Sequence, residues 1–138
     1  MAWKLTVAVL VLFFLLILST CVLFELEFDP CGNEELQTIL SPAAKRKAVI
    51  FQRDCGATTR FSTQVSVLSA SSGLPREAGN TLTADTDHGQ APSGPGGGPL
   101  VTVQWTAELE LLVKYDKRAR VFRSEQSVDG VTIIYDPQ

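Results

Sequence analysis

A run of twenty residues near the start of the chain, from Leu5 to Phe24, contains no charged side chain. At about 1.5 Å of rise per residue, a helix of this length covers about 30 Å, the thickness of a bilayer's hydrocarbon core. A domain of roughly 100 residues has no interior that could surround such an apolar helix on every side. Residues 1–24 are therefore predicted to form a transmembrane signal-anchor helix, with residues 5–24 as its contact with the membrane.

Charges on the two sides of this run predict its orientation. Lys4 precedes the run, whereas no Lys or Arg follows it closely and several acids do: Glu25, Glu27, Asp29, Glu34 and Glu35. Basic residues that flank a span remain on the cytoplasmic side. We therefore expect a single-pass protein of the cytoplasmic (inner) membrane whose carboxy-terminal part lies outside the cytoplasm.

Two other fates of the run are compatible with the sequence. Leu18–Cys21 is similar to a bacterial lipoprotein signal, which would leave the protein lipid-anchored at Cys21, although Thr20 stands where Gly, Ala or Ser is usual. Cleavage as a secretory signal is the second alternative, but the apolar region of such a signal usually has only 7–15 residues. In all three cases the remaining chain lies outside the cytoplasm.

The chain after the run is predicted to form an acidic stalk and an all-β domain. Residues 25–40 are acidic and interrupted by Pro30 and Gly32, which is typical of a stalk and compatible with a helical turn over Glu34–Leu40. From residue 41 to residue 138, apolar and polar residues alternate with the period of strands that have one buried face. Strands are expected over 47–54, 61–70, 100–105, 108–115, 119–125 and 130–136.

These strands predict a small antiparallel β-meander of six or seven strands, arranged as a sandwich or an open barrel. The segments YDKR and VDG have turn residues suited to tight connections between the last three strands. Val49 and Phe51 are expected to share one face of their strand. The aromatic residues of the predicted strands are expected in the core or on a sheet face: Trp105, Tyr115, Phe122 and Tyr135.

Residues 86–99 interrupt the strand pattern with three prolines and five glycines. Such a composition cannot build a core, so it predicts a surface loop or a disordered insert. The segment is either a binding loop or a tolerated insertion.

Charge indicates which partners the chain can have. The formal net charge is −3, and without Lys4 the remaining 11 basic and 15 acidic residues give −4. No long basic block is present, so nucleic acid is not expected as a partner. The charged run from Lys114 to Arg120 is either a solvated hairpin tip or a contact surface for an acidic protein.

Cysteine usage predicts one crosslink. Cys21 lies in the apolar run, which leaves Cys31 and Cys55 as a pair outside the reducing cytoplasm, where a disulfide is the simplest expectation. Such a bond closes a loop of about 25 residues, which stabilises a domain by about 3 kcal/mol.

The alternative, a thiol-dependent enzyme or redox protein that uses Cys55, needs a base beside that sulfur. The only histidine, His88, lies in the Gly-rich segment. No catalytic residue is therefore predicted.

Metal and cofactor sites are poorly supported. Asp85–Gly89 is similar to the start of a calcium loop, but the distal bidentate Glu of an EF-hand is absent. Two cysteines and one histidine without clustered spacing do not form a closed zinc site. No metal ligand and no cofactor is predicted, and binding of a small ligand or a metal through residues 85–99 is kept as an alternative function.

Several segments together resemble a family of small bacterial membrane-anchored proteins of unknown function. They are Cys31-x-Asn33-Glu34, the stretch containing RDCGATT and STQVS (residues 53–59 and 62–66), Gly79–Asn80, and the VxW…L.L.Y hairpin that begins at Val103. SPAAK and the Gly/Pro segment depart from the family pattern. The resemblance implies no activity, cofactor or catalytic residue, but it supports the pairing of Cys31 with Cys55.

These observations predict a membrane-anchored bacterial envelope protein that is not an enzyme. Its β-domain would act by binding another protein, for example as an inhibitor or an immunity protein against a toxin. The sequence does not identify that protein partner.

Overall fold

The computed structural model describes residues 2–27, 30–56 and 59–138, and within helix α1 it leaves out the side chains of residues 2, 5 and 20–27. The chain divides into two compact units, Met1–Pro30 and Cys31–Gln138. The lipid-anchor alternative concerns Cys21, whose side chain lies outside the described residues.

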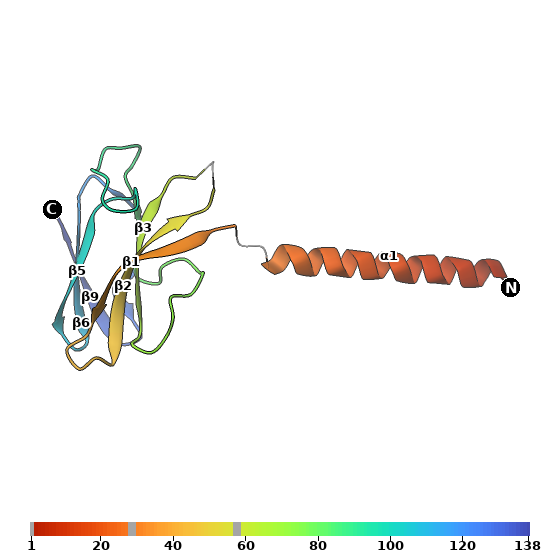
Figure 1. Cartoon of the computed structure of the whole chain (residues 1–138), viewed down its shortest axis with the longest axis horizontal. Helices are drawn as coiled ribbons and strands as arrows, with labels where there is room; N and C mark the ends of the chain where they lie inside the picture. The colour runs from red at the N-terminus through yellow and green to blue at the C-terminus, as the bar shows by residue number, and fades with distance from the viewer. Residues whose placement is uncertain (1, 28–29, 57–58) are drawn as a thin grey trace. The chain divides into compact units, whose positions relative to one another are not determined.

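The first unit is the helix α1 (Ala2–Glu27), shown in Figure 1. Apolar side chains such as Leu10, Phe13 and Phe14 are exposed along it. Counting only the described residues, no helix contains a stretch that is both long enough and apolar enough to cross a membrane.

The second unit consists of two β-sheets, which Figure 1 shows as two layers. The five-stranded sheet has the order β1 (Gly32–Leu40), β2 (Arg46–Asp54), β3 (Ser62–Ser69), β4 (Leu82–Asp85) and β7 (Arg120–Ser124). The four-stranded sheet has the order β5 (Val101–Ala107), β6 (Glu110–Tyr115), β9 (Val131–Pro137) and β8 (Ser127–Val128). The all-β prediction for this part of the chain is confirmed, and all six predicted strands are present with ends shifted by a few residues.

The core lies between the two sheets. It is built from alternate residues of facing strands, because successive side chains of a strand point to opposite faces. The five-stranded sheet contributes Ala48, Ile50, Val65, Val67 and Leu82. The four-stranded sheet contributes Val101, Leu111, Val113, Val131 and Ile133.

The predicted meander is wrong in its connections. β6 and β9 pair in parallel, from Glu110↔Thr132 to Tyr115↔Pro137. After β6, a turn in which the Ala119 N–H donates to the Asp116 carbonyl (2.9 Å) is followed by β7, which joins the other sheet beside β4. This tight turn connects strands of two different sheets, so it does not form a hairpin. Turn residues alone do not distinguish a turn within one sheet from a turn between two sheets.

The second predicted turn, VDG, does form a hairpin. Asp129 and Gly130 have φ values of 48° and 79°, and they connect β8 to β9. Two consecutive residues with positive φ are typical of the tight turn whose twist matches that of paired strands.

The predicted stalk is wrong for residues 32–40, which form β1 and pair with β2 from Gly32↔Asp54 to Leu40↔Lys47. The register shifts between Glu35 and Gln37. This bulge breaks the two-residue period, so Leu36 and Ile39 both pack against the core although they are three positions apart. Residues 32–40 therefore lack a regular strand pattern, and the helical turn that was expected over Glu34–Leu40 does not form.

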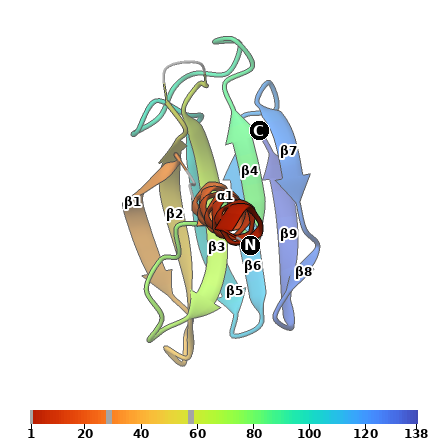
Figure 2. The ribbon, with the colours of Figure 1, turned by 90° about the vertical axis from the view of Figure 1, so that its right-hand side faces the viewer.

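Strand β2 is buried on both faces. Ala48 and Ile50 contribute to the core between the sheets, so Val49 and Phe51 face the opposite side, and both are fully buried as well. Figures 1 and 2 show the chain between β3 and β4 passing over this outer side of the five-stranded sheet. We call residues 70–81 the β3–β4 segment. Val49 and Phe51 share a face as predicted, but that face lies under this segment and not between the sheets.

The Gly/Pro segment is a folded surface loop, which confirms the first of its two predicted states. Ser93 and Pro99 form a bridge, and the Gly94 N–H donates to the Gly98 carbonyl at 2.7 Å. Thr63 Oγ1 donates to the Pro99 carbonyl at 2.7 Å and holds the loop against β3. Ala91 and Pro99 are buried despite the composition of the segment.

Candidate functional site

The disulfide predicted between Cys31 and Cys55 is present. Cys31 comes directly before β1 and Cys55 directly after β2, and the pairing of Gly32 with Asp54 brings the two cysteines together. The bond closes the open end of this strand pair. The Cys55 sulfur is bonded to the Cys31 sulfur and is not a free thiol, so Cys55 is not available as a nucleophile in this state.

The other sequence candidates do not form a metal site. Asp85 ends β4 and pairs with an arginine, whereas His88 is exposed in a tight turn with a φ of 59°. No cluster of three or more His, Cys, Asp or Glu side chains that could hold a metal occurs among the described residues.

Two sequence candidates, Cys55 and His88, instead line the same surface hollow of about 410 Å³. We call it the Phe122 hollow. Its side chains come from the ends of β3, β4 and β7 and the loops beside them, and those that determine its chemistry are Arg60, Asp85, His88, Arg120 and Phe122. Thr59, Ser62 and Thr83 add hydroxyl groups.

Arg120 is held in the hollow by Asp85. Its Nη2 lies 2.5 Å from Asp85 Oδ2, and Asp85 Oδ1 accepts a hydrogen bond from the Asp87 N–H at 2.8 Å. Burial acts to raise the pKa of Asp85, but the hydrogen bonds from Arg120 and Asp87 outweigh it and hold the pKa below its ordinary value. Asp85 is therefore a buried anion that orients the exposed guanidinium.

Phe122 is the apolar part of the hollow. Its side chain is 61% exposed on β7, and Arg120 Cζ lies 4.9 Å from the centre of its ring. An arginine at this distance from an aromatic face is stabilised by the ring's charge distribution. Arginine and aromatic side chains are enriched at protein interfaces and dominate their binding energy. The arrangement is thus suited to binding.

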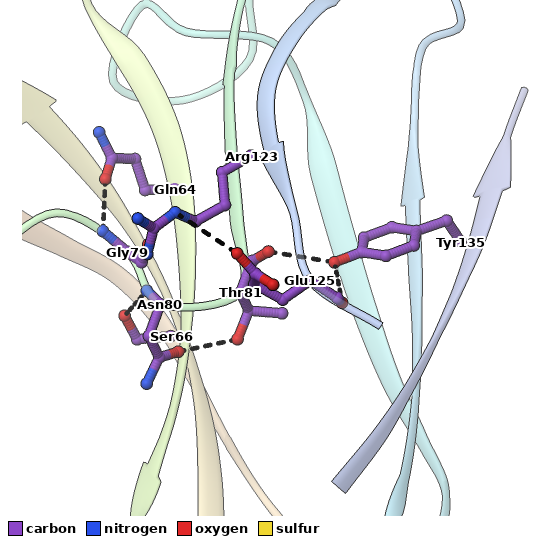
Figure 3. Close-up of polar contacts among 8 residues, drawn as sticks. All are labelled: Gln64, Ser66, Gly79, Asn80, Thr81, Arg123, Glu125 and Tyr135. Carbon is purple, nitrogen blue, oxygen red and sulfur yellow. Dashed lines mark hydrogen bonds and ion pairs between the residues drawn. The ribbon is translucent and has the colours of Figure 1, made fainter. Parts of the chain in front are cut away.

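The β3–β4 segment is held in place by polar contacts, which Figure 3 shows. Gln64 Oε1 accepts from the Gly79 N–H at 2.6 Å, and Ser66 Oγ accepts from the Asn80 N–H at 3.2 Å. A Cβ on Gly79 would lie 2.8 Å from the Val65 carbonyl oxygen, so no other residue fits there without a shift of the backbone. Arg123 Nη1 donates to the Gly79 carbonyl at 3.3 Å and connects the segment to β7.

Asn33 and Arg53 hold the other part of the segment. Asn33 Nδ2 donates to the carbonyls of Pro75 and Glu77, both at 2.8 Å. Arg53 Nη1 donates to Asn33 Oδ1 at 2.7 Å and to the Arg76 carbonyl. Side chains from β1 and β2 thus replace strand partners for a stretch of irregular backbone, which keeps Phe51 covered.

Tyr135 ties the two sheets together at the end of the β3–β4 segment (Figure 3). Its hydroxyl lies 3.1 Å from the Thr81 carbonyl and 2.8 Å from the Glu125 carbonyl and donates toward both. Burial is the main cause that raises the pKa of Tyr135, followed by the charge of Glu125. The phenol is therefore a structural hydrogen-bond donor.

Tyr135→Phe is expected to lower the free energy of unfolding by about 1–2 kcal/mol at neutral pH, because it leaves the Glu125 carbonyl without this donor. The folded state holds the Tyr135 proton more tightly than the unfolded chain does. The contribution of the Tyr135 hydroxyl to the free energy of unfolding is complete below the pKa of about 10 that tyrosine has in the unfolded chain. It is lost as the pH rises above that value. Urea unfolding between pH 7 and pH 11 should therefore show a steeper alkaline loss in the natural chain than in the variant.

Tyr115→Phe is the matched control for Tyr135→Phe. The Tyr115 ring lies 6.4 Å from the Tyr135 ring, but its hydroxyl has no hydrogen bond among the described residues. Equal losses in the two variants would show that the Tyr135 hydroxyl bonds do not stabilise the fold.

The charged run from Lys114 to Arg120 is largely paired within the domain. Arg118 binds Asp116 at 2.7 Å, and Lys114 lies 3.4 Å from Asp136. The hydrogen bond from the Arg118 side chain lowers the pKa of Asp116 to about 2. Only Arg120 of this run reaches the Phe122 hollow.

The sequence did not predict the roles of the polar residues that hold the β3–β4 segment and the Phe122 hollow. Nothing local to the sequence indicated that Asn33 and Arg53 hold the β3–β4 segment, or that Asp85 pairs with Arg120. A charged residue placed close to Phe51 in a buried strand is the one signal that could have drawn attention to Arg53.

No protein-family model, no curated protein and no solved structure matches this chain. The resemblance to small bacterial membrane-anchored proteins therefore stays a prediction, and the site is interpreted from its own geometry.

Proposed function

We propose that this chain is a protein-binding module of the bacterial envelope and not an enzyme, with its β-domain held outside the cytoplasm by the amino-terminal helix. The Phe122 hollow is the binding surface. An inhibitor or immunity protein that neutralises a toxin is one form of this function. The bound protein would present an acidic or apolar group to Arg120 and Phe122.

The observation that carries the proposal is the exposed Phe122 ring beside an oriented Arg120. Exposing a large aromatic side chain to water costs free energy that burial in an interface recovers. Asp85 already orients the guanidinium, so binding loses little side-chain freedom. A partner that covers Phe122 also removes water from the Arg120–Asp85 pair and strengthens it.

Two features support the location outside the cytoplasm. The Cys31–Cys55 disulfide is of the kind that persists in oxidising compartments. The uncharged sequence from Leu5 to Phe24 has the length of a membrane span, and Lys4 before it favours a cytoplasmic amino terminus. The anchoring proposal rests on this sequence pattern.

A photo-crosslinking side chain in place of Phe122 tests the proposal in the cell that makes the protein. We expect irradiation to yield a discrete covalent adduct with one protein, because the new ring occupies the centre of the binding surface. The adduct should stay in the membrane pellet after alkaline extraction, and protease added to spheroplasts should cleave its β-domain. Asp85→Asn in the same background should reduce the yield several-fold, because it releases Arg120.

The matched control carries the same crosslinker in place of Leu109, which is 50% exposed against 61% for Phe122 but lies in the β5–β6 hairpin, away from the hollow. No adduct is expected there. Equal yields at both positions, or none at either, would remove the support for the Phe122 hollow as a binding surface. Release by alkaline extraction would contradict the anchor alone.

A further inference from the structure

The Gly/Pro segment, residues 86–99, borders a second hollow, of about 160 Å³. We call it the inter-sheet hollow, because residues from both sheets line it. Ile50 and Val101, which belong to the core, form its inner part. Leu36 of β1 lines it as well, and so do Pro95 and Pro99 of the Gly/Pro segment.

The inter-sheet hollow lies between β1 and β5, at the end where these two edge strands are not bridged by their side chains. Toward the other end, Trp105 Nε1 donates to the Ile39 carbonyl at 3.1 Å. Beyond it, Ser41 Oγ donates to Glu108 Oε1 at 2.9 Å. These bonds close the gap between the sheets there, whereas the gap beside the start of β5 remains as the hollow.

A bulge in β1 provides one wall of this hollow. Glu35 pairs with Phe51 and Gln37 pairs with Ile50, so Leu36 is an extra residue in the register of the strand. Bulges change the direction of a side chain, and they are over-represented next to active sites. Leu36 both packs against the core and lines the hollow. The bulge therefore presents an apolar side chain to this space.

The Gly/Pro segment provides a second wall, which packs tightly on β3. The Gly94 N–H donates to the Gly98 carbonyl, and Thr63 Oγ1 donates to the Pro99 carbonyl. A Cβ on Gly98 would lie 2.5 Å from the Thr63 nitrogen, so only glycine permits this approach of the two backbones. A wall fixed in this way is formed before a ligand arrives, which lowers the cost of binding.

The lining of the hollow determines which ligand it accepts. Among the described residues around it, none has a charged side chain. The buried hydroxyl of Thr63 already donates to the Pro99 carbonyl, and the other polar side chains, Gln37 and Thr102, are exposed. A charge without a partner is costly to remove from water, so an ionic ligand is excluded.

The size of the hollow sets the size of the ligand. Protein interiors are close-packed, and voids larger than a water molecule are few in a domain. An apolar cavity of roughly 150 Å³ remains dry and takes up benzene. Leu100, which is 54% exposed, lies at the same hollow and would lose contact with water when a ligand fills it.

We propose that the inter-sheet hollow binds a small uncharged organic molecule whose apolar body has about six carbon atoms. The Gly/Pro segment is then a binding loop. The inter-sheet hollow and the Phe122 hollow have no lining residue in common. This site is therefore independent of the proposed function, and a failure of either proposal leaves the other in place.

Benzene is the probe that tests the site, and methyl NMR of the full chain in lipid nanodiscs is the measurement. We expect saturable shifts of the Ile50 and Val101 methyl signals on titration with benzene. The methyl signals of Ile133, a core residue outside the hollow, should move far less. Benzoate has the same ring and a charge, so it should not shift any of these signals. No saturable shift with benzene, or equal shifts with benzoate, would overturn the proposal.

Leu36→Trp should weaken the binding of benzene by about tenfold or more, because the larger side chain takes up space in the hollow. Leu40→Trp is the matched control, since it makes the same change on the same strand at a position that is 53% exposed and outside the hollow. It should bind benzene as the natural chain does. Uptake of benzene by the lipid affects both variants equally. Equal binding by the two variants would overturn the proposal.

A measurement on the natural chain decides the matter if Leu36→Trp disturbs folding. At a saturating concentration of benzene, intermolecular nuclear Overhauser effects should connect its protons to the methyl groups of Leu36 and Ile50. The Ile133 methyl groups should show none. Effects that reach Ile133 as strongly as Ile50, or that are absent at Leu36 and Ile50, would overturn the proposal.

Discussion

Phe51→Ala is expected to lower the free energy of unfolding by about 3–5 kcal/mol, the usual cost of removing a buried aromatic ring. Phe51 has no exposed surface, although it lies on the outer side of the five-stranded sheet. The ring is covered by the β3–β4 segment, which the hydrogen bonds of Asn33 and Arg53 hold over β2. Urea unfolding followed by circular dichroism measures the loss.

Phe122→Ala is the control for Phe51→Ala, because it removes the same ring from a position that is 61% exposed. A change within about 0.5 kcal/mol is expected for it. Hydrogen exchange adds a local measurement: the amides of Gly79 and Asn80 should exchange faster in Phe51→Ala, since the segment loses its apolar support. Similar unfolding free energies for the two variants would contradict the burial of Phe51 under the segment.

Removal of the disulfide is expected to have the second large effect. Replacing Cys31 and Cys55 by alanine should lower the free energy of unfolding by about 3 kcal/mol, because the unfolded chain regains the freedom of a loop with a sequence separation of 24. Unfolding of the natural chain with and without a reductant should differ by a similar amount.

The double alanine variant is also the control for reduction, since a reductant should not change its stability. A natural chain that is equally stable with and without reductant would contradict the crosslink as a stabilising element. Intact-mass measurement should show two hydrogens fewer in the oxidised protein than in the reduced one.

The alternation of apolar residues was sufficient to predict six strands and most of the core. It succeeded for β6 and β9, where Leu111, Val113 and Ile133 face inward at regular spacing. It failed for β1, where a bulge between Glu35 and Gln37 breaks the period. Period-two alternation describes one strand at a time, so it did not show that β6 and β9 pair in parallel.

The candidate site was less predictable than the fold. Phe122 was expected in the core or on a sheet face, and the pattern of β7 did not show that this face is open to water. Asp85 and Arg120 are 35 positions apart, and only the pairing of β4 with β7 brings them together. Long-range pairs of this kind leave no local signal in a single sequence.

Local backbone preferences were enough to predict six of the strands and the Asp129–Gly130 turn, and the small number of cysteines was enough to predict the pairing of Cys31 with Cys55. Tertiary structure alone decided which face of β2 is covered by the β3–β4 segment, which strands become neighbours, and that Phe122 stays in water while Phe51 does not. Two phenylalanines in similar strand patterns have the same local preferences. Their burial differs because burial depends on the segments that pack over them, and that packing is a property of the whole fold.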